Sequence, residues 1–179
     1  GAATAAAPFF ARNLFAQSPN TVLRHASFGV GGMGWSDLTQ FKAHPKFKLV
    51  AFCDADSKQI DKVQKQFPEA RAYRDWRVLL DKEAKNIDSV NVATPDHMHA
   101  PIAVSAMQLG KHVYGQKPRA HDLYEVRRMT EIAKQKKVVT QMGIQIHSAA
   151  AYRIGVSVLQ SGAIGKIKEV HSWCPKSWG

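Results

Sequence analysis

The 179-residue sequence predicts an α/β fold built on a doubly wound parallel sheet. Between residues 25 and 141, short apolar segments alternate with amphipathic segments of about ten residues, which is the spacing of strands and crossover helices. A glycine-rich turn, Gly29-Val-Gly-Gly-Met-Gly34, stands between the first expected strand and the first expected helix. Together these two observations are typical of a Rossmann-type dinucleotide-binding domain.

The expected elements follow one another closely along the chain. In order they are strand 25–30, helix 35–42, strand 47–53, helix 58–67, strand 71–73, helix 76–82, strand 87–93, helix 100–109, strand 112–114, helix 123–136 and strand 138–141. Asp75 stands where it can cap the helix after it, and Gly110 where it can end the helix before it. We expect right-handed crossovers and a ligand beyond the carboxyl ends of the strands.

The composition is that of a folded globular domain. Hydrophobic residues make up 45% of the chain, charged residues 22% and aromatic residues 9%, which excludes a disordered chain and a collagen-like fibre. The two cysteines, Cys53 and Cys174, belong to no Cys-x-x-Cys or Cys/His cluster, so neither a disulfide framework nor a structural zinc site is expected. The sequence has no apolar run of the roughly 18 residues that a membrane span needs.

The net charge of +11 calls for a comparison with nucleic-acid-binding proteins. Eight of the 25 Lys and Arg residues lie between residues 111 and 137, and much of this segment's charge lies on the exposed face of one expected helix. This segment shows no RNP, helix-turn-helix or zinc-finger pattern. We therefore interpret it as a solvated face, with attraction for acidic sugars or an anionic partner as the alternative, and we expect no nucleic-acid partner.

The glycine turn predicts the site of a diphosphate. In such turns Gly29 allows the tight bend, Gly31 lets the backbone approach the diphosphate, and Gly34 lets the helix pack closely on the strand. Gly32 and Met33 lie between them, at the expected amino end of the helix. Backbone N–H groups and the helix dipole at such an end favour an anion.

Asp54 is the expected ribose ligand. It follows the second strand, 20 positions beyond Gly34, where an acid can accept hydrogen bonds from the ribose hydroxyls. Its charge would repel a 2′-phosphate, and no arginine adjoins it in the sequence, so NAD is favoured over NADP. The alternative is that Asp54, with Asp56 and Ser57, caps the helix over 58–67.

Polar residues also follow the fourth and fifth strands. After the fourth comes Thr94-Pro-Asp-His-Met-His99, and after the fifth comes Gly115-Gln-Lys-Pro-Arg119. Each proline prevents a regular strand from continuing and fixes a turn. His97 and His99 are two positions apart, which on a helix points them to different faces, so we predict no metal site there.

Five segments in this order resemble one known family: GVGGMG, CDAD, VATPDHMHA, GKHVYGQKP and TQMG. The resemblance is to the N-terminal half of the Gfo/Idh/MocA oxidoreductases and extends over residues 25–179. It implies a Rossmann domain followed by an open-faced C-terminal sheet domain, and hydride transfer between NAD(P) and sugars or polyols. On this basis we expect a leader over 1–22, an NAD-binding domain over 23–145, and the beginning of a substrate domain over 146–179, with a strand over 167–173.

The resemblance also implies roles for individual residues. Lys117 matches the family lysine that lies near the nicotinamide and hydrogen-bonds the reacting hydroxyl, whereas Gln116 stands where the family usually has glutamate. The resemblance further implies that Thr94, Pro95 and His99 line the nicotinamide–ribose end of the cofactor site, next to Gln116 and Lys117. His147 is a weaker candidate for facing the substrate, and a capping or packing role is as well supported.

These features predict an NAD-dependent oxidoreductase acting on a sugar, polyol or sugar derivative. The alternatives are an NAD-dependent glycosidase of the same family and, because of Gln116, a catalytically silent nucleotide- or sugar-binding protein. The family's catalytic Asp-x-x-x-His pair has no match in this chain, so we expect a piece of a longer product, inactive alone. The family also implies a homo-oligomer formed through the C-terminal sheet.

The first 22 residues predict an export leader. They are rich in small residues, have Arg12 as their only charge and show no amphipathic period. They resemble the end of a twin-arginine-type signal, which favours a periplasmic or exported protein. The alternative is a flexible linker on a cytoplasmic protein.

Overall fold

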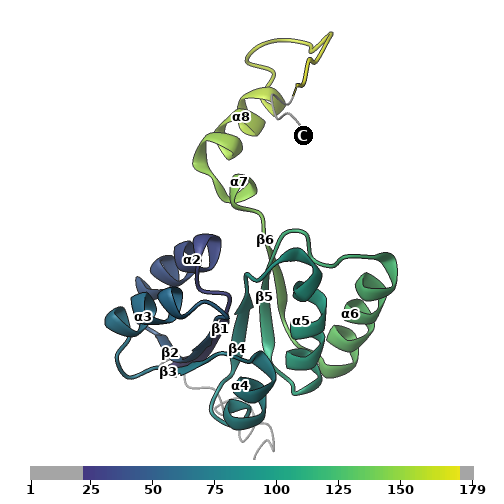
Figure 1. Ribbon diagram of the computed structural model, residues 1–179. Coiled ribbons are helices and arrows are strands. Elements are labelled where there is room, and N and C mark those ends of the chain that lie inside the picture. Colours follow the sequence, from purple (N-terminus) through teal and green to yellow (C-terminus); the bar gives the residue numbers. More distant parts are fainter. Residues whose placement is uncertain (1–21, 174–179) are drawn as a thin grey trace, which may run out of the picture. The chain divides into compact units, whose positions relative to one another are not determined.

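A computed structural model describes residues 22–173 of the chain. Its centre is a parallel sheet of six strands in the order β3-β2-β1-β4-β5-β6 (Figure 1). The strands are β1 (Leu23–Phe28), β2 (Phe47–Cys53), β3 (Arg71–Tyr73), β4 (Ser89–Val92), β5 (His112–Gln116) and β6 (Thr140–Gly143). This order confirms the predicted Rossmann-type fold and puts the reversal of strand order between β1 and β4.

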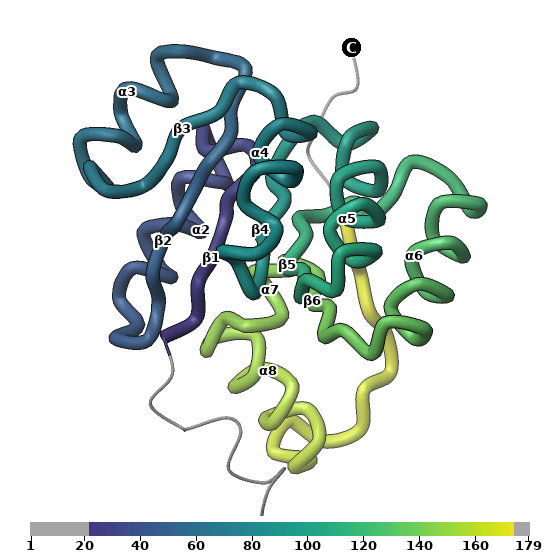
Figure 2. Tube along the Cα trace, turned by 90° about the horizontal axis from the view of Figure 1, so that it is seen from below, coloured from purple at the N-terminus to yellow at the C-terminus, as the bar shows by residue number. Residues whose placement is uncertain are grey.

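Helices connect the strands and cover both faces of the sheet (Figures 1 and 2). They are α2 (Gly32–Lys42), α3 (Ser57–Gln66), α4 (Trp76–Glu83), α5 (His99–Gln108), which follows a short 3₁₀ turn at Asp96–Met98, and α6 (Leu123–Lys136). On one face, Leu38 of α2 and Val63 of α3 pack with apolar side chains of β2. On the other face, α4, α5 and α6 pack on β1, β4 and β5 in the larger core.

Aspartates fix where three of the helices begin. The side chain of Asp56 accepts a hydrogen bond from the Lys58 N–H at the start of α3 (2.9 Å), and that of Asp75 accepts one from the Arg77 N–H at the start of α4 (2.8 Å). At α6, the Asp122 side chain accepts from the Glu125 N–H, while the Glu125 side chain accepts from the N–H of His121, the residue before the N-cap. The expected cap at Asp75 is thus present.

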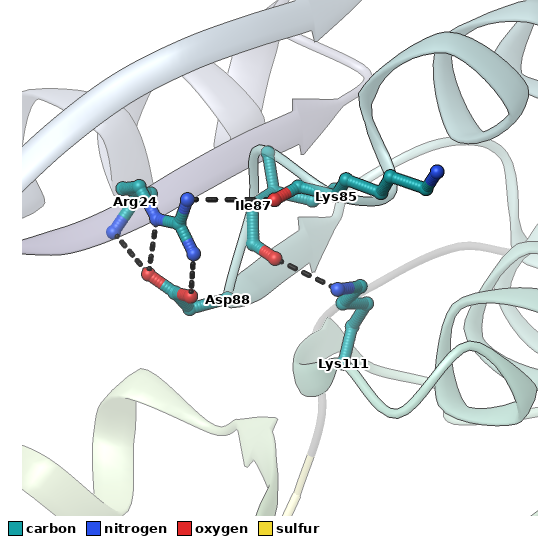
Figure 3. A network of polar contacts seen from close by, with 5 residues as sticks. All are labelled: Arg24, Lys85, Ile87, Asp88 and Lys111. Carbon is teal, nitrogen blue, oxygen red and sulfur yellow. Dashed lines mark hydrogen bonds and ion pairs between the residues drawn. The ribbon is translucent and has the colours of Figure 1, made fainter. Parts of the chain in front are cut away.

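A polar network holds the amino ends of the central strands together (Figure 3). The Asp88 carboxylate accepts from the guanidinium of Arg24 at 2.6 and 3.0 Å and from the Arg24 backbone N–H at 2.9 Å. The ammonium of Lys111 donates to the Ile87 carbonyl at 2.9 Å. These bonds join the beginnings of β1, β4 and β5, at the end of the sheet away from the glycine turn.

The chain divides into two compact units between Gly143 and Ile144. The second unit contains α7 (Gln145–Ser148) and α8 (Ala150–Gln160). The prediction of a strand over 167–173 is wrong, because these residues form no regular secondary structure. A strand without a neighbouring strand would leave its backbone N–H and C=O groups without hydrogen-bond partners. The domain boundary at 145 and oligomerisation stay predictions.

The structure allows a search for membrane-spanning helices, but it describes almost none of the predicted export leader. No helix between residues 22 and 173 is both long enough and apolar enough to cross a bilayer. The predicted leader lies outside the described residues except for Val22, so export stays a prediction.

Candidate functional site

A cavity of about 640 Å³ opens at the carboxyl ends of β1, β2 and β4, where the strand order reverses. Predicted cofactor residues from three separate segments line it: Gly29, Gly31, Gly32 and Met33 after β1, Asp54 after β2, and Thr94 and Pro95 after β4. Ligands of doubly wound sheets bind at this position. The structure therefore brings together most of the cofactor residues that the sequence predicted.

The glycine turn has two kinds of glycine. A Cβ on Gly29, whose φ is +74°, would lie 2.5 Å from the Ala93 carbonyl oxygen, and a Cβ on Gly34 would lie 1.9 Å from the Gly29 carbonyl oxygen. These two glycines are required by the packing of the chain itself. Gly31 is different: its φ of −89° and ψ of 170° suit any residue, and the atoms nearest to a Cβ there belong to the flexible side chain of Gln59, the first at 3.2 Å.

Asp54 ties the glycine turn to the end of β2. One carboxylate oxygen accepts from the Val30 N–H at 2.8 Å, and the other accepts from the Asp56 N–H at 3.0 Å. Asp54 also lines the cavity. The alternative that Asp54 itself caps α3 is wrong, because Asp56 is the N-cap residue.

Arg74 is a cavity residue that the sequence analysis missed. Because β3 pairs with β2 in parallel, with Tyr73 opposite Cys53, the residues that follow the two strands lie next to each other. The Asp54 N–H accordingly donates to the Tyr73 carbonyl at 3.2 Å, and the Arg74 guanidinium donates to the Ala55 carbonyl at 3.1 Å. The register of two parallel strands was the only signal that could have found this arginine.

His99 joins the two proline turns. Its ring is 3% exposed, with Nε2 2.7 Å from the Thr94 carbonyl oxygen and Nδ1 2.5 Å from the Pro118 carbonyl oxygen. The peptide bond between Lys117 and Pro118 is cis. The two ring nitrogens thus face backbone carbonyls of the two proline turns, and the His99 ring lies between Thr94 and Pro118. His97, by contrast, is exposed.

Gln116 is buried and Lys117 is exposed, although they are neighbours in the chain. The Gln116 side-chain amide donates to both carboxylate oxygens of Asp37 in α2, at 3.1 and 2.9 Å. Burial raises the pKa of Asp37, and its hydrogen bonds with Gln116 and Asn91 oppose this shift. The sequence analysis missed Asp37, because nothing in the sequence relates it to a residue 79 positions away.

The described residues fit a dinucleotide. The hydroxyl of Thr94, in the cavity wall, is buried and has no hydrogen-bond partner within residues 22–173. Gly31 presents no side chain at the amino end of α2, and Asp54 supplies carboxylate oxygens to the same cavity. Over the same range, no group of three or more His, Cys, Asp or Glu side chains is placed to hold a metal ion.

His147 lies in the second unit. It belongs to α7, is exposed, and its ring stacks on that of Tyr152 with centroids 5.2 Å apart. A packing contact is therefore present, and a role toward substrate stays a prediction.

Comparison with known proteins assigns a family to this arrangement. Residues 23–144 match the Gfo/Idh/MocA model, described as an oxidoreductase family with an NAD-binding Rossmann fold. A levoglucosan dehydrogenase from Pseudarthrobacter phenanthrenivorans is 28% identical over 84% of this chain and 40% of its own length. An α-N-acetylgalactosaminidase from Shewanella oneidensis is 26% identical over 82% of this chain and 33% of its own length.

A solved structure agrees with this assignment. The myo-inositol 2-dehydrogenase of Lactobacillus plantarum is 28% identical, with a TM-score of 0.76 over 82% of this chain and 43% of its own. The chain thus spans less than half the length of each of these relatives.

Proposed function

The chain belongs to the Gfo/Idh/MocA oxidoreductase family, and from this premise we propose that the protein transfers a hydride between NAD and a carbon–hydroxyl group of a sugar, polyol or sugar derivative. The observation that supports this most is the cavity at the strand-order reversal, which the glycine turn, Asp54 and Thr94 line together. The dehydrogenases of levoglucosan and myo-inositol among the relatives support the substrate class.

Each part of the site has a task in this proposal. The amino end of α2, reached across Gly31, holds the diphosphate, and Asp54 accepts hydrogen bonds from the adenosine ribose. Thr94 and Pro95 form the wall toward the nicotinamide, and His99 keeps that wall fixed relative to Pro118. Bound NAD would supply the hydride acceptor at this end.

Lys117 is the proposed catalytic residue of this chain. It is exposed, directly follows the buried Gln116, and stands on the turn that His99 joins to Thr94. Its ammonium can donate a hydrogen bond to the reacting hydroxyl and stabilise the negative charge that develops on that oxygen.

We propose NAD rather than NADP as the cofactor. The Asp54 carboxylate lies in the cavity, where it favours ribose hydroxyls and disfavours a 2′-phosphate. Arg74, which lines the same cavity, would favour that phosphate. The preference for NAD over NADP therefore depends on the balance between the Asp54 carboxylate, which favours NAD, and the Arg74 guanidinium, which favours NADP.

A glycosidase that uses NAD is the second candidate. The family relative from Shewanella oneidensis is an α-N-acetylgalactosaminidase, which shows that a related chain can belong to a hydrolase. Both candidates need the same dinucleotide site, and they differ in whether the bound nicotinamide is reduced at the end of a cycle.

The test follows NADH formation at 340 nm in the protein at its full natural length, over a panel that includes levoglucosan, myo-inositol and an α-N-acetylgalactosaminide. Net NADH with a sugar or polyol supports the dehydrogenase, and sugar release without net NADH supports the glycosidase. Lys117→Ala should lower turnover by roughly two orders of magnitude or more, the scale of one positioned acid–base group. Lys136→Ala, which removes an exposed lysine of α6, is the matched control. The proposal is refuted if the protein forms no NADH, releases no sugar and does not bind NAD.

A further inference from the structure

A buried carboxylate faces a buried amide next to the turn that contains Lys117. Asp37 is 8% exposed and Gln116 is 5% exposed, and the Gln116 amide donates to the two oxygens of Asp37 at 3.1 and 2.9 Å. Asn91, which is fully buried on β4, donates to the same carboxylate at 3.5 Å. Three elements, α2, β4 and β5, therefore meet at one carboxylate.

The groups that face this carboxylate provide no positive charge to pair with it. From β1, His25 contacts Asn91, and burial lowers the pKa of its imidazole to about 4, so the ring is neutral at pH 7. From β5, Tyr114 has a pKa raised by burial and by the charge of Asp37, so it is neutral as well. Among residues 22–173, no cation forms an ion pair with Asp37.

The space around Gln116 is closed on the side of β6. A Cβ on Gly143, the last residue of that strand, would lie 2.7 Å from the Gln116 amide nitrogen and 2.8 Å from the Tyr114 hydroxyl. The Gln116 side chain is thus held between Asp37 and the backbone of Gly143. Because Gln116 is the last residue of β5, its fixed position determines where the turn with Lys117 begins.

These contacts also explain why residue 116 is glutamine and not glutamate. A glutamate at this position would place two carboxylates about 3 Å apart in a buried site, where both cannot be ionised at once. The amide instead donates a hydrogen bond to the carboxylate and leaves one negative charge in the pair.

We propose that Asp37 is a positioning residue for Lys117: its carboxylate holds Gln116, fixes the start of the Lys117 turn, and supplies the only negative charge of the pair. The part that concerns Lys117 rests on the proposed function. The pairing of Asp37 with Gln116 does not.

The first test is a charge-exchange cycle of three variants, Asp37→Asn, Gln116→Glu and the double variant, measured by thermal unfolding between pH 5 and pH 8. In Gln116→Glu the folded pair retains a proton that the unfolded chain releases, so stability falls as the pH rises. We expect its unfolding midpoint to drop by roughly 10 °C more than the parent's over this range. The double variant restores one carboxylate and one amide, so its pH dependence should return to that of the parent.

The outcomes of this cycle decide the pairing. If Gln116→Glu folds only at low pH, the double variant, which adds Asp37→Asn, should still fold at pH 8, and this recovery would equally support the pairing. If Gln116→Glu is no more sensitive to pH than the parent, or if the double variant is no better than the single one, the pairing is refuted.

The second test measures the positioning role on the full-length protein. Asp37→Asn should lower kcat about tenfold and shift the pH–rate profile, with NAD affinity within a few-fold of the parent, and the double variant should recover most of the kcat. An Asp37→Asn variant with the parent's kcat and pH profile would make the pair purely structural and refute the positioning role. If the parent itself neither binds NAD nor turns over, the proposed function fails, and the unfolding cycle still decides the pairing.

Discussion

Gly31→Val separates binding of the cofactor from folding of the chain. The backbone at Gly31 is extended, with φ −89° and ψ 170°, which valine adopts without strain. The atoms nearest to an added Cβ belong to the Gln59 side chain, the first at 3.2 Å, and that side chain can move. We expect a loss of folding stability of no more than about 1–2 kcal/mol, mostly from a poorer N-cap residue for α2.

The same substitution should remove most of the affinity for NAD. The branched side chain would fill the space through which the diphosphate reaches the amino end of α2. Losing two hydrogen bonds to a charged group, each worth about 1.5–3 kcal/mol, gives about 3–6 kcal/mol in total. Since a factor of ten corresponds to about 1.4 kcal/mol, the dissociation constant should rise by two to four orders of magnitude.

Isothermal titration calorimetry with NAD, together with thermal unfolding, checks both expectations in one preparation. Gly34→Ala is the contrasting variant, because its Cβ would lie 1.9 Å from the backbone oxygen of Gly29, so it should lose stability as well as binding. A Gly31→Val protein that binds NAD within a few-fold of the parent would show that the diphosphate lies elsewhere.

Three further substitutions test other parts of the reasoning. Asp54→Ala should narrow the preference for NAD over NADP, and Arg74→Ala should widen it, since the two residues have opposite charges in one cavity. Competition binding with both cofactors measures the preference. Equal affinities of the parent for NAD and NADP would contradict the assignment of Asp54. Glu83→Gln should remove up to about 2 kcal/mol of stability at pH 7, because ion pairing with Arg71 and a hydrogen bond from Tyr73 lower the Glu83 pKa to about 2. This contribution is complete above the ordinary carboxyl pKa and is lost as the pH falls toward 2, so parent and variant should converge in acid; a constant difference down to pH 2 would contradict the assignment.

The sequence by itself predicted the kind and order of the elements. Apolar strands and amphipathic helices differ in period, and that difference is local, so it can be recognised without the fold. Element bounds were less accurate: β6 is Thr140–Gly143, two residues later than expected, and α2 begins at Gly32 instead of Trp35. Glycines disfavour a helix by propensity, but a Cβ on Gly34, in the first turn of α2, would lie 1.9 Å from the Gly29 carbonyl oxygen, so close packing requires a glycine there.

The glycine turn and Asp54 were also predictable, because both follow strands and their spacing along the chain is fixed by one strand–helix–strand unit. Even there, the sequence could not decide which aspartate caps α3. Asp54 and Asp56 differ by two positions, and only the folded backbone shows that Asp54 bonds the Val30 N–H while Asp56 bonds that of Lys58.

The tertiary structure alone decided which residues complete the site. Arg74 reaches the cavity that Asp54 lines through the register of β2 with β3, and Asp37 meets Gln116 across 79 positions through the packing of α2 on the sheet. Neither relation leaves a local pattern, since strand register and helix placement are set by the whole core and not by the residues they bring together. The sequence therefore predicted a dinucleotide site at this end of the sheet, and the packing of α2 determined that Gln116 there has a buried carboxylate as its partner.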